Sequence, residues 1–323
     1  MSCTRHCARR SGLWLGVSVL LLVSGCMSTP TDTQAPTKKQ TTPDRAGPGQ
    51  TPPPKPPGIP AEFARPIDYA RTIGSLLYRH ERAAERANAV LHARNATAPP
   101  DDLGWVTEQV DGQGTLQVTF VAGPQREPGR WQAWSRVLVR AASAATAPST
   151  DATAAGADQL LTQTLPALSP FERNKLSARL TALAAEASGC GTNMRVVVIA
   201  WRRAGQDIFL AYRLSDSANT QQVLLGSQHE FVLDARGQRL LQLNTSEPGC
   251  STIPRGAHGA TLARSSATQT TPTLFDVYVS LREARPMQLT TLLNNLRWQV
   301  DGDGVRLRSS SSSTDSAQAS EAP

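Results

Sequence analysis

The feature that most constrains the fold is a succession of short β-type segments in the second half of the chain. From residue 194 onward, segments rich in Val, Leu and aromatic residues follow one another without a helical pattern between them. Such strands pair antiparallel, because a parallel pair needs a long crossover connection, usually a helix. Parallel βαβ units are therefore not expected. Strands are predicted at 194–201, 207–214, 222–226, 229–235, 238–245 and 273–281, and short ones near 286–290, 296–300 and 305–308.

Two helices are expected to pack against these strands. The first covers about 67–93, where one apolar stripe recurs at helical spacing: Ile67, Ala70, Ile73, Leu77, Ala84, Ala87 and Leu91. The second begins at the capping box of Ser169 and Glu172, with Pro170 at its first position, and ends at Gly189. Its expected apolar stripe is Leu176, Leu180, Leu183, Ala184 and Ala187.

Three further strands are predicted between the two helices, at 104–110, 115–122 and 131–140, with a hairpin turn at 111–114. The fold class that follows is α+β. We expect an antiparallel β-rich domain of one or two sheets with two amphipathic helices, after a disordered Pro-rich tether.

The amino terminus has the pattern of a secretory signal peptide. Arginines 5, 9 and 10 precede an apolar run from Leu13 to Val23, and small residues follow. The run is shorter than the roughly 20 apolar residues that a membrane-spanning helix needs. The segment Val23-Ser24-Gly25-Cys26 resembles the lipobox of bacterial lipoproteins. An ordinary secreted protein with a chance cysteine at this position is the alternative.

The lipobox resemblance implies that the Cys26 thiol receives a diacylglycerol, that the chain is cut after Gly25, and that the new amino group is acylated, for example with palmitate. Two or more acyl chains hold a protein firmly at a bilayer. Residue 27 is Met and not Asp, which by the same resemblance favours the outer membrane, facing the periplasm. The inner membrane and the cell surface remain alternatives.

Composition divides the chain into six segments. These are a signal peptide (1–25), the lipidated Cys26 with a disordered Pro-rich linker (26–60), a helix with a β subdomain (61–140), a low-complexity loop or linker (141–158), a C-terminal α+β subdomain (159–308) and a disordered Ser-rich tail (309–323).

The chain has five cysteines, of which Cys3 and Cys7 belong to the signal peptide and Cys26 takes the lipid. Cys190 and Cys250 remain, and in an oxidising compartment they are expected to form a disulfide. This bridge closes a loop of about 60 residues and contributes about 4 kcal/mol in the chain-entropy model. A metal pair or a reactive thiol is the alternative, but no histidine or acid lies at ligand spacing beside either cysteine.

A second resemblance covers residues 170–308. Its ordered pieces are a capped helix ending in GCG, then VVVIAW, FLAYRL, LLGSQHEFVLDARGQ, a second cysteine and PTLFDVYVSLREARPMQLTT. This order is similar to that of a group of uncharacterised exported bacterial proteins. The resemblance implies no activity and no site residues.

Chemical motifs are sparse. The net charge of +7 is partly carried by the signal peptide and the linker, so nucleic-acid binding is not expected. Ser227 and His229 are two residues apart, and with the neighbouring Glu230 they are the weak candidates for catalysis. Asp301 and Asp303 begin a calcium-loop pattern whose later ligands are missing, so they fit a tight turn. No metal and no cofactor are expected.

Two classes of function fit these observations. The first is a non-enzymatic protein-binding module held at the membrane through Cys26, with a periplasmic or envelope protein as partner. An immunity or inhibitor lipoprotein and an accessory of an envelope assembly are its concrete forms. The second is a cell-envelope hydrolase acting on peptidoglycan or lipid, which the lack of a catalytic motif disfavours.

The candidate binding patch comprises Trp131, Trp134, Trp201 and Trp298 with a basic helix stripe, Arg71, Arg79, Arg82 and Arg86. For this stripe the alternative is a solvated face.

Overall fold

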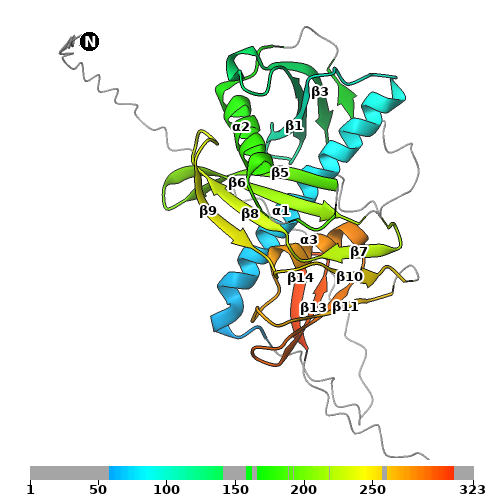
Figure 1. Ribbon diagram of the computed structural model, residues 1–323. Helices are drawn as coiled ribbons and strands as arrows, with labels where there is room; N and C mark the ends of the chain where they lie inside the picture. Colours follow the sequence, from blue (N-terminus) through cyan, green and yellow to red (C-terminus); the bar gives the residue numbers. More distant parts are fainter. Residues whose placement is uncertain are drawn as a thin grey trace, which may run out of the picture. The chain divides into compact units, whose positions relative to one another are not determined.

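The computed structural model in Figure 1 describes residues 58–140, 158–161, 166–187, 189–191, 193–217, 219–256 and 260–308. The chain divides near Pro53 into two units, and all described residues belong to the second, Pro54–Pro323. The predicted signal peptide, Cys26, the linker up to residue 57 and the tail from 309 lie outside the described residues. So does the predicted low-complexity loop, apart from Asp158.

The described residues form the predicted α+β fold, with three α-helices and four mostly antiparallel sheets. The helices are α1 (Ala61–Ala93), α2 (Pro170–Ala184) and α3 (Leu274–Glu283), with a 3₁₀ turn η1 (Pro128–Arg130). Sheet A contains β1 (Asp102–Gln109), β2 (Leu116–Ala122), β3 (Gln132–Val139) and β4 (Gln159–Leu160). Sheet B contains β5 (Asn193–Arg203), β6 (Gln206–Asp216), β8 (His229–Leu233) and β9 (Leu240–Thr245). Sheet C pairs β7 (Gln222–Leu225) with β10 (Ser251–Pro254). Sheet D contains β11 (Leu262–Ser266), β12 (Met287–Thr291), β13 (Leu296–Asp301) and β14 (Gly304–Arg308).

The helix α1 contacts several sheets along its length (Figure 1). All seven residues of its predicted apolar stripe are buried. The first half of the stripe, including Ile73 and Leu77, packs in a core cluster built from sheets B and D and from α3. The second half, including Ala84 and Leu91, packs against sheet A. At the crossing with α3 a Cβ on Gly74 would lie 2.6 Å from the backbone oxygen of Leu274, so only glycine allows this close approach.

The helix α2 begins at the predicted capping box, in which the Ser169 hydroxyl accepts from the Glu172 amide and the Glu172 carboxylate accepts from the Ser169 amide. The helix ends at Ala184, five residues before Gly189. Its predicted apolar stripe is wrong at Leu183 and Ala184, which are both exposed. The reason is that α2 packs against two sheets at once. Its buried residues divide between a cluster that includes part of sheet A and a cluster with sheet B.

The predicted strand at 273–281 is wrong, because this segment forms α3. A capping box of Thr273 and Asp276 starts the helix. The segment was predicted as a strand because it is rich in valine and aromatic residues, which here are buried on several sides of a short helix. The helix connects β11 to β12, which pair in parallel. The expectation that parallel βαβ units are absent is therefore also wrong. The short and polar β11, LARSS, has no alternating pattern that would have predicted it.

The predicted disulfide is confirmed. Cys190 and Cys250 are bonded, with their Cα atoms 5.6 Å apart. The bond links the segment between α2 and β5 to the residue that precedes β10. The disulfide therefore ties sheet C to the segment that connects α2 to β5.

Candidate functional site

A cavity of about 260 Å³ lies between the first turns of α1, the carboxyl end of β9 and the loop that precedes α3. Its apolar walls come from Pro66, Ala70, Pro272, Leu274 and Phe275. The polar groups that line it are Tyr69, Glu230, Asn244, Thr245, Ser246, Gln269, Thr271 and Thr273. An apolar cavity with a few convergent polar groups is the usual form of a binding site.

Glu230 is the charged residue of this cavity, and its side chain accepts three hydrogen bonds. The hydroxyls of Tyr69 and Tyr212 each donate to its Oε1 at 2.6 Å. The amide of Asn244 donates to Oε2 at 2.7 Å. Glu230 is only 7% exposed, and a carboxylate buried to this extent needs such donors.

The register of sheet B brings these groups together. Tyr212 of β6 and Asn244 of β9 are the direct cross-strand neighbours of Glu230, so all three side chains share one face of the sheet. The opposite face carries Phe231, which packs in the cluster with α2. Tyr69 reaches Glu230 from α1, which covers the first face.

The two tyrosines are held as hydrogen-bond donors. Burial raises the pKa of Tyr69 above its usual range, and the hydrogen bond and charge of Glu230 add to this effect. Burial likewise raises the pKa of Tyr212, again with the charge of Glu230 as the next cause. Both hydroxyls therefore keep their protons at ordinary pH. The arrangement supplies a fixed carboxylate and hydrogen bonds inside apolar walls, and the described residues that line the cavity include no second acid, histidine, cysteine or lysine.

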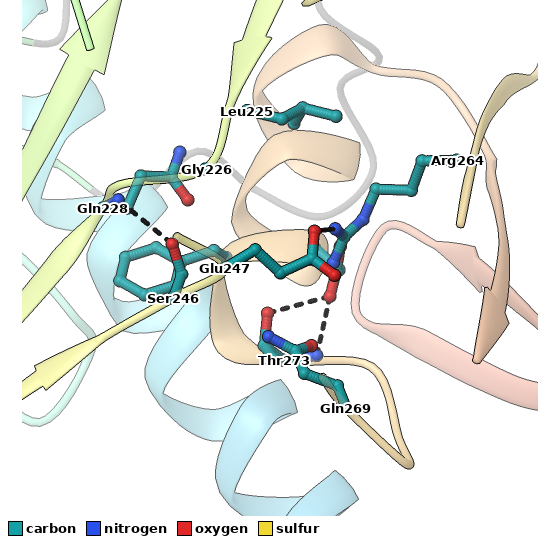
Figure 2. A pocket seen from close by; sticks show the side chains of 10 residues that line it. Leu225, Gly226, Gln228, Ser246, Glu247, Arg264, Gln269 and Thr273 are labelled. Carbon is teal, nitrogen blue, oxygen red and sulfur yellow. Dashed lines mark hydrogen bonds and ion pairs between the residues drawn. The ribbon is translucent and has the colours of Figure 1, made fainter. Parts of the chain in front are cut away.

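A smaller cavity of about 10 Å³ adjoins the first and shares Ser246, Gln269, Thr273 and Phe275 with it. In Figure 2 the carboxylate of Glu247 faces the guanidinium of Arg264, and these groups form an ion pair at 2.6 Å. A second carboxylate, that of Asp276 at the start of α3, pairs with the same arginine at 2.6 Å. These ion pairs join the segment after β9 to β11 and α3, and so fix one wall of the larger cavity.

The strand β9 forms an edge of sheet B. Among the described residues no strand pairs with its outer side. Its three leucines are exposed, Leu240 at 42%, Leu241 at 46% and Leu243 at 40%. An edge strand offers unpaired backbone groups, and soluble proteins ordinarily protect such an edge with charge or proline. The last residues of β9 are also part of the cavity wall.

Two more exposed leucines lie close to the loop that precedes α3. Leu292 and Leu293 occupy the turn between β12 and β13, and Leu293 is 62% exposed. The side-chain amide of the neighbouring Asn294 donates to the backbone oxygen of Thr270 at 2.8 Å. Since Gln269 and Thr271 line the cavity, this turn lies beside its rim.

The structure places the weak catalytic candidates apart from the cavity, except for Glu230. Ser227 and His229 are buried, the Ser227 hydroxyl donates to the backbone oxygen of Gly249, and His229 Nδ1 pairs with the Thr245 hydroxyl at 3.1 Å. Neither side chain lines the cavity. Asp301 and Asp303 lie in the tight turn between β13 and β14. Across the described ranges no group of three His, Cys, Asp or Glu is placed to hold a metal ion.

The basic stripe of α1 is engaged within the protein. Arg71 donates to the backbone oxygen of Asp303 at 2.8 Å, and Arg79 donates to the side chain of Gln109 at 2.9 Å. Arg82 pairs with Glu85 one turn further along the helix. The fourth arginine, Arg86, forms a two-pronged ion pair with Asp158.

The four candidate tryptophans do not form one surface. Trp298 is fully buried in the cluster of sheets B and D, and Trp201 packs against its margin. Trp131 is buried in a second cluster, with α2, and Trp134 is half-buried beside the cluster between α1 and sheet A. Cys26 lies outside the described residues.

Sequence reasoning named Glu230 but missed its partners. Tyr69 lies 161 residues away along the chain, and no local pattern links the two. The one local signal was the strand pattern around Glu230, since its neighbours in sheet B had to come from the adjoining strands.

No described helix is long and apolar enough to cross a membrane.

Comparison with models of known protein families, with curated proteins and with solved structures finds no match for this chain.

Proposed function

We propose that this chain is a lipid-anchored lipoprotein of the outer membrane, facing the periplasm, that binds a partner protein without catalysing a reaction. The observation that carries the proposal is the edge strand β9 with its accessible leucines beside an open cavity. Such an edge is a template for an extended segment of another protein, which adds as a further strand. The lipobox at Cys26 supports the anchor, and the Pro-rich linker supplies reach.

The partner we infer is an envelope or periplasmic protein with an extended, partly aliphatic segment. Backbone hydrogen bonds to β9 would supply affinity, and the side chains that meet the leucines and the cavity would supply specificity. An inhibitor or immunity protein and an accessory of an envelope assembly are the two concrete forms of this proposal.

A cell-envelope hydrolase is the less favoured alternative. Hydrolysis of a glycosidic bond ordinarily uses two carboxyl groups, and acyl transfer uses a nucleophile with a base. The cavity offers one carboxylate, and the two tyrosines that donate to it keep their protons. This chemistry suits the recognition of a ligand better than its turnover.

The test is a crosslinked capture from the envelope, followed by identification of the bound proteins by mass spectrometry. We expect one dominant partner for the wild type and its loss in Cys26→Ser, which removes the lipid. Leu241→Lys should reduce capture, because it places a charge on the edge of β9. Leu183→Lys is the matched control, since Leu183 is 40% exposed and belongs to α2, outside sheet B.

Both leucine variants should retain the urea midpoint of the wild type, which shows that they fold. Equal capture by Leu241→Lys and Leu183→Lys would contradict the role of β9. If the wild type captures only the general proteins of the envelope, the binding proposal itself is wrong, and substrate screens with the same protein become the next step.

A further inference from the structure

We propose that the cavity beside β9 receives a basic side chain, lysine or arginine, of the partner protein, with Glu230 as its counter-charge. The inference rests on the proposed function and names the chemistry of its recognition site. It follows from the ion pairs that the other buried acids form with arginine, from the apolar walls of the cavity and from the position of β9.

Four acidic residues are buried in the part of the chain that the structure describes, and three of them are paired with arginine. The three pairs are Glu81–Arg195, Glu172–Arg136 and Asp276–Arg264. Glu230 is the fourth, and within the described residues it forms no ion pair with lysine or arginine. Arg203 is an exposed residue whose charge acts on Tyr69, and it forms no ion pair with Glu230 in this part of the chain.

Burial of a charge is costly unless the charge is paired and hydrogen-bonded. The three hydrogen bonds to Glu230 satisfy part of this need, but they leave its negative charge uncompensated. The unpaired acid is also the one that lines an open cavity. A cation that enters the cavity therefore completes an arrangement that the other three buried acids already have.

The walls of the cavity suit the rest of such a side chain. Lysine and arginine carry a long aliphatic stem that packs along apolar surface while the charged end meets a polar group. The apolar residues from α1 and from the loop before α3 supply this surface. The cavity of about 260 Å³ accommodates a side chain, whereas sites for drug-sized ligands measure roughly 300–1,000 Å³.

The position of the cavity indicates how the side chain arrives. Asn244 and Thr245, the last residues of β9, and the following Ser246 contribute to its wall. A strand that pairs with the outer edge of β9 would reach the cavity at one of its ends. Because alternate side chains of a strand point to the same face, one basic residue near that end can turn toward Glu230.

The first experiment uses the full chain in detergent micelles, with ¹³C-labelled tyrosine side chains observed by NMR. The chain has four tyrosines, and two of them, Tyr69 and Tyr212, contact Glu230. The other two, Tyr78 and Tyr278, serve as internal controls. The probes are methylguanidinium and n-butylammonium, with N-methylurea and n-butanol as neutral counterparts and n-butyrate as the anion.

We expect the cations to shift the signals of Tyr69 and Tyr212 at millimolar concentration, and the neutral and anionic probes to bind about tenfold more weakly or not at all. Glu230→Gln keeps the shape and should weaken cation binding by about tenfold or more. Glu108→Gln is the control, because Glu108 is a partly buried acid on sheet A with no ion pair among the described residues. Equal binding of cation and neutral probe to the wild type overturns the inference even if Glu230→Gln fails to fold.

The second experiment repeats the envelope capture with Glu230→Gln and separates this inference from the proposed function. Loss of the partner in this variant, with capture by Glu108→Gln intact, supports a basic side chain in the cavity. Full capture by Glu230→Gln overturns it, because the partner then binds elsewhere, while the proposed function stands. If the wild type captures no partner, both proposals fail as stated, and cation binding then identifies a site for a small amine.

Discussion

The buried lysine of α2 gives a prediction with a defined dependence on pH. Lys175 is buried, and its ammonium group donates to the backbone oxygen of Thr107 in β1. Burial lowers the pKa of Lys175 to about 7, an effect opposed by the charge of Glu108. In the unfolded chain the pKa of a lysine is about 10.4. Above pH 7 the unfolded state therefore binds more protons than the folded state.

The sign and the size follow from proton linkage. Below pH 7 both states hold the proton, and the full cost of the buried charge is present. As pH rises from 7 toward 10.4 this cost is relieved, and the free energy of unfolding increases by up to about 1.4 kcal/mol per pH unit. Lys175→Met keeps an unbranched side chain, one atom shorter than that of lysine, and removes the titration. Between pH 7 and 9.5 we expect the wild type to gain about 3 kcal/mol relative to this variant.

The measurement is urea unfolding of both proteins at several pH values in this range, followed by tryptophan fluorescence. At pH 7 the variant should be the more stable protein, although it leaves the Thr107 oxygen without its donor, which costs about 1–3 kcal/mol. Titrating groups that do not interact with Lys175 are common to both proteins, so they cancel in the difference. Two pH profiles that run parallel would refute the reasoning, because they would show that Lys175 titrates alike in both states.

Three further predictions concern stability. Gly74→Ala should lower the free energy of unfolding by about 1–3 kcal/mol, since the new Cβ would lie 2.6 Å from a backbone oxygen of α3; an unchanged or higher melting temperature would contradict this. Replacing Cys190 and Cys250 together by serine should cost about 2–4 kcal/mol in urea unfolding, and an unchanged midpoint would show that the bond does not stabilise the fold. Asp276→Ala removes the cap of α3 and leaves Arg264 with one carboxylate, so a loss of about 3–5 kcal/mol is expected. A thermal midpoint equal to that of the wild type would count against the importance of this ion pair.

Local patterns predicted much of this fold because they act within a few residues. The stripe of α1, the capping box at Ser169 and the turn after Asp111 depend on spacing and on hydrogen bonds to nearby amides. In that turn the Asp111 carboxylate accepts from two backbone amides within four residues, as the hairpin required. The same local reasoning failed at α3, where valines and aromatics are buried on several sides of a short helix and so resemble a strand in composition.

The candidate site was less accessible to sequence reasoning. Its acid was named, but the partners of Glu230 come from α1, β6 and β9, and only the tertiary structure brings them together. The tryptophans were chosen for the candidate binding patch by residue type alone. Residue type does not reveal burial, and Trp298 is fully buried. What distinguishes Glu230 is that it has no arginine partner among the described residues, and such a difference is visible only when every buried acid can be compared.

The placement of α1 has a consequence for how the chain acquires its structure. This helix is the first described element, but hydrogen bonds join it to residues 161, 197 and 232 positions further along. Pairings of such long sequence separation form slowly, because closing a long loop costs conformational entropy before the contact can compensate for it. In a chain that emerges amino end first, the first half of the α1 stripe lacks part of its core until β12 to β14 have followed, whereas the second half meets sheet A much earlier. Loss of the last two described strands would therefore leave the earliest helix without part of the core that it needs.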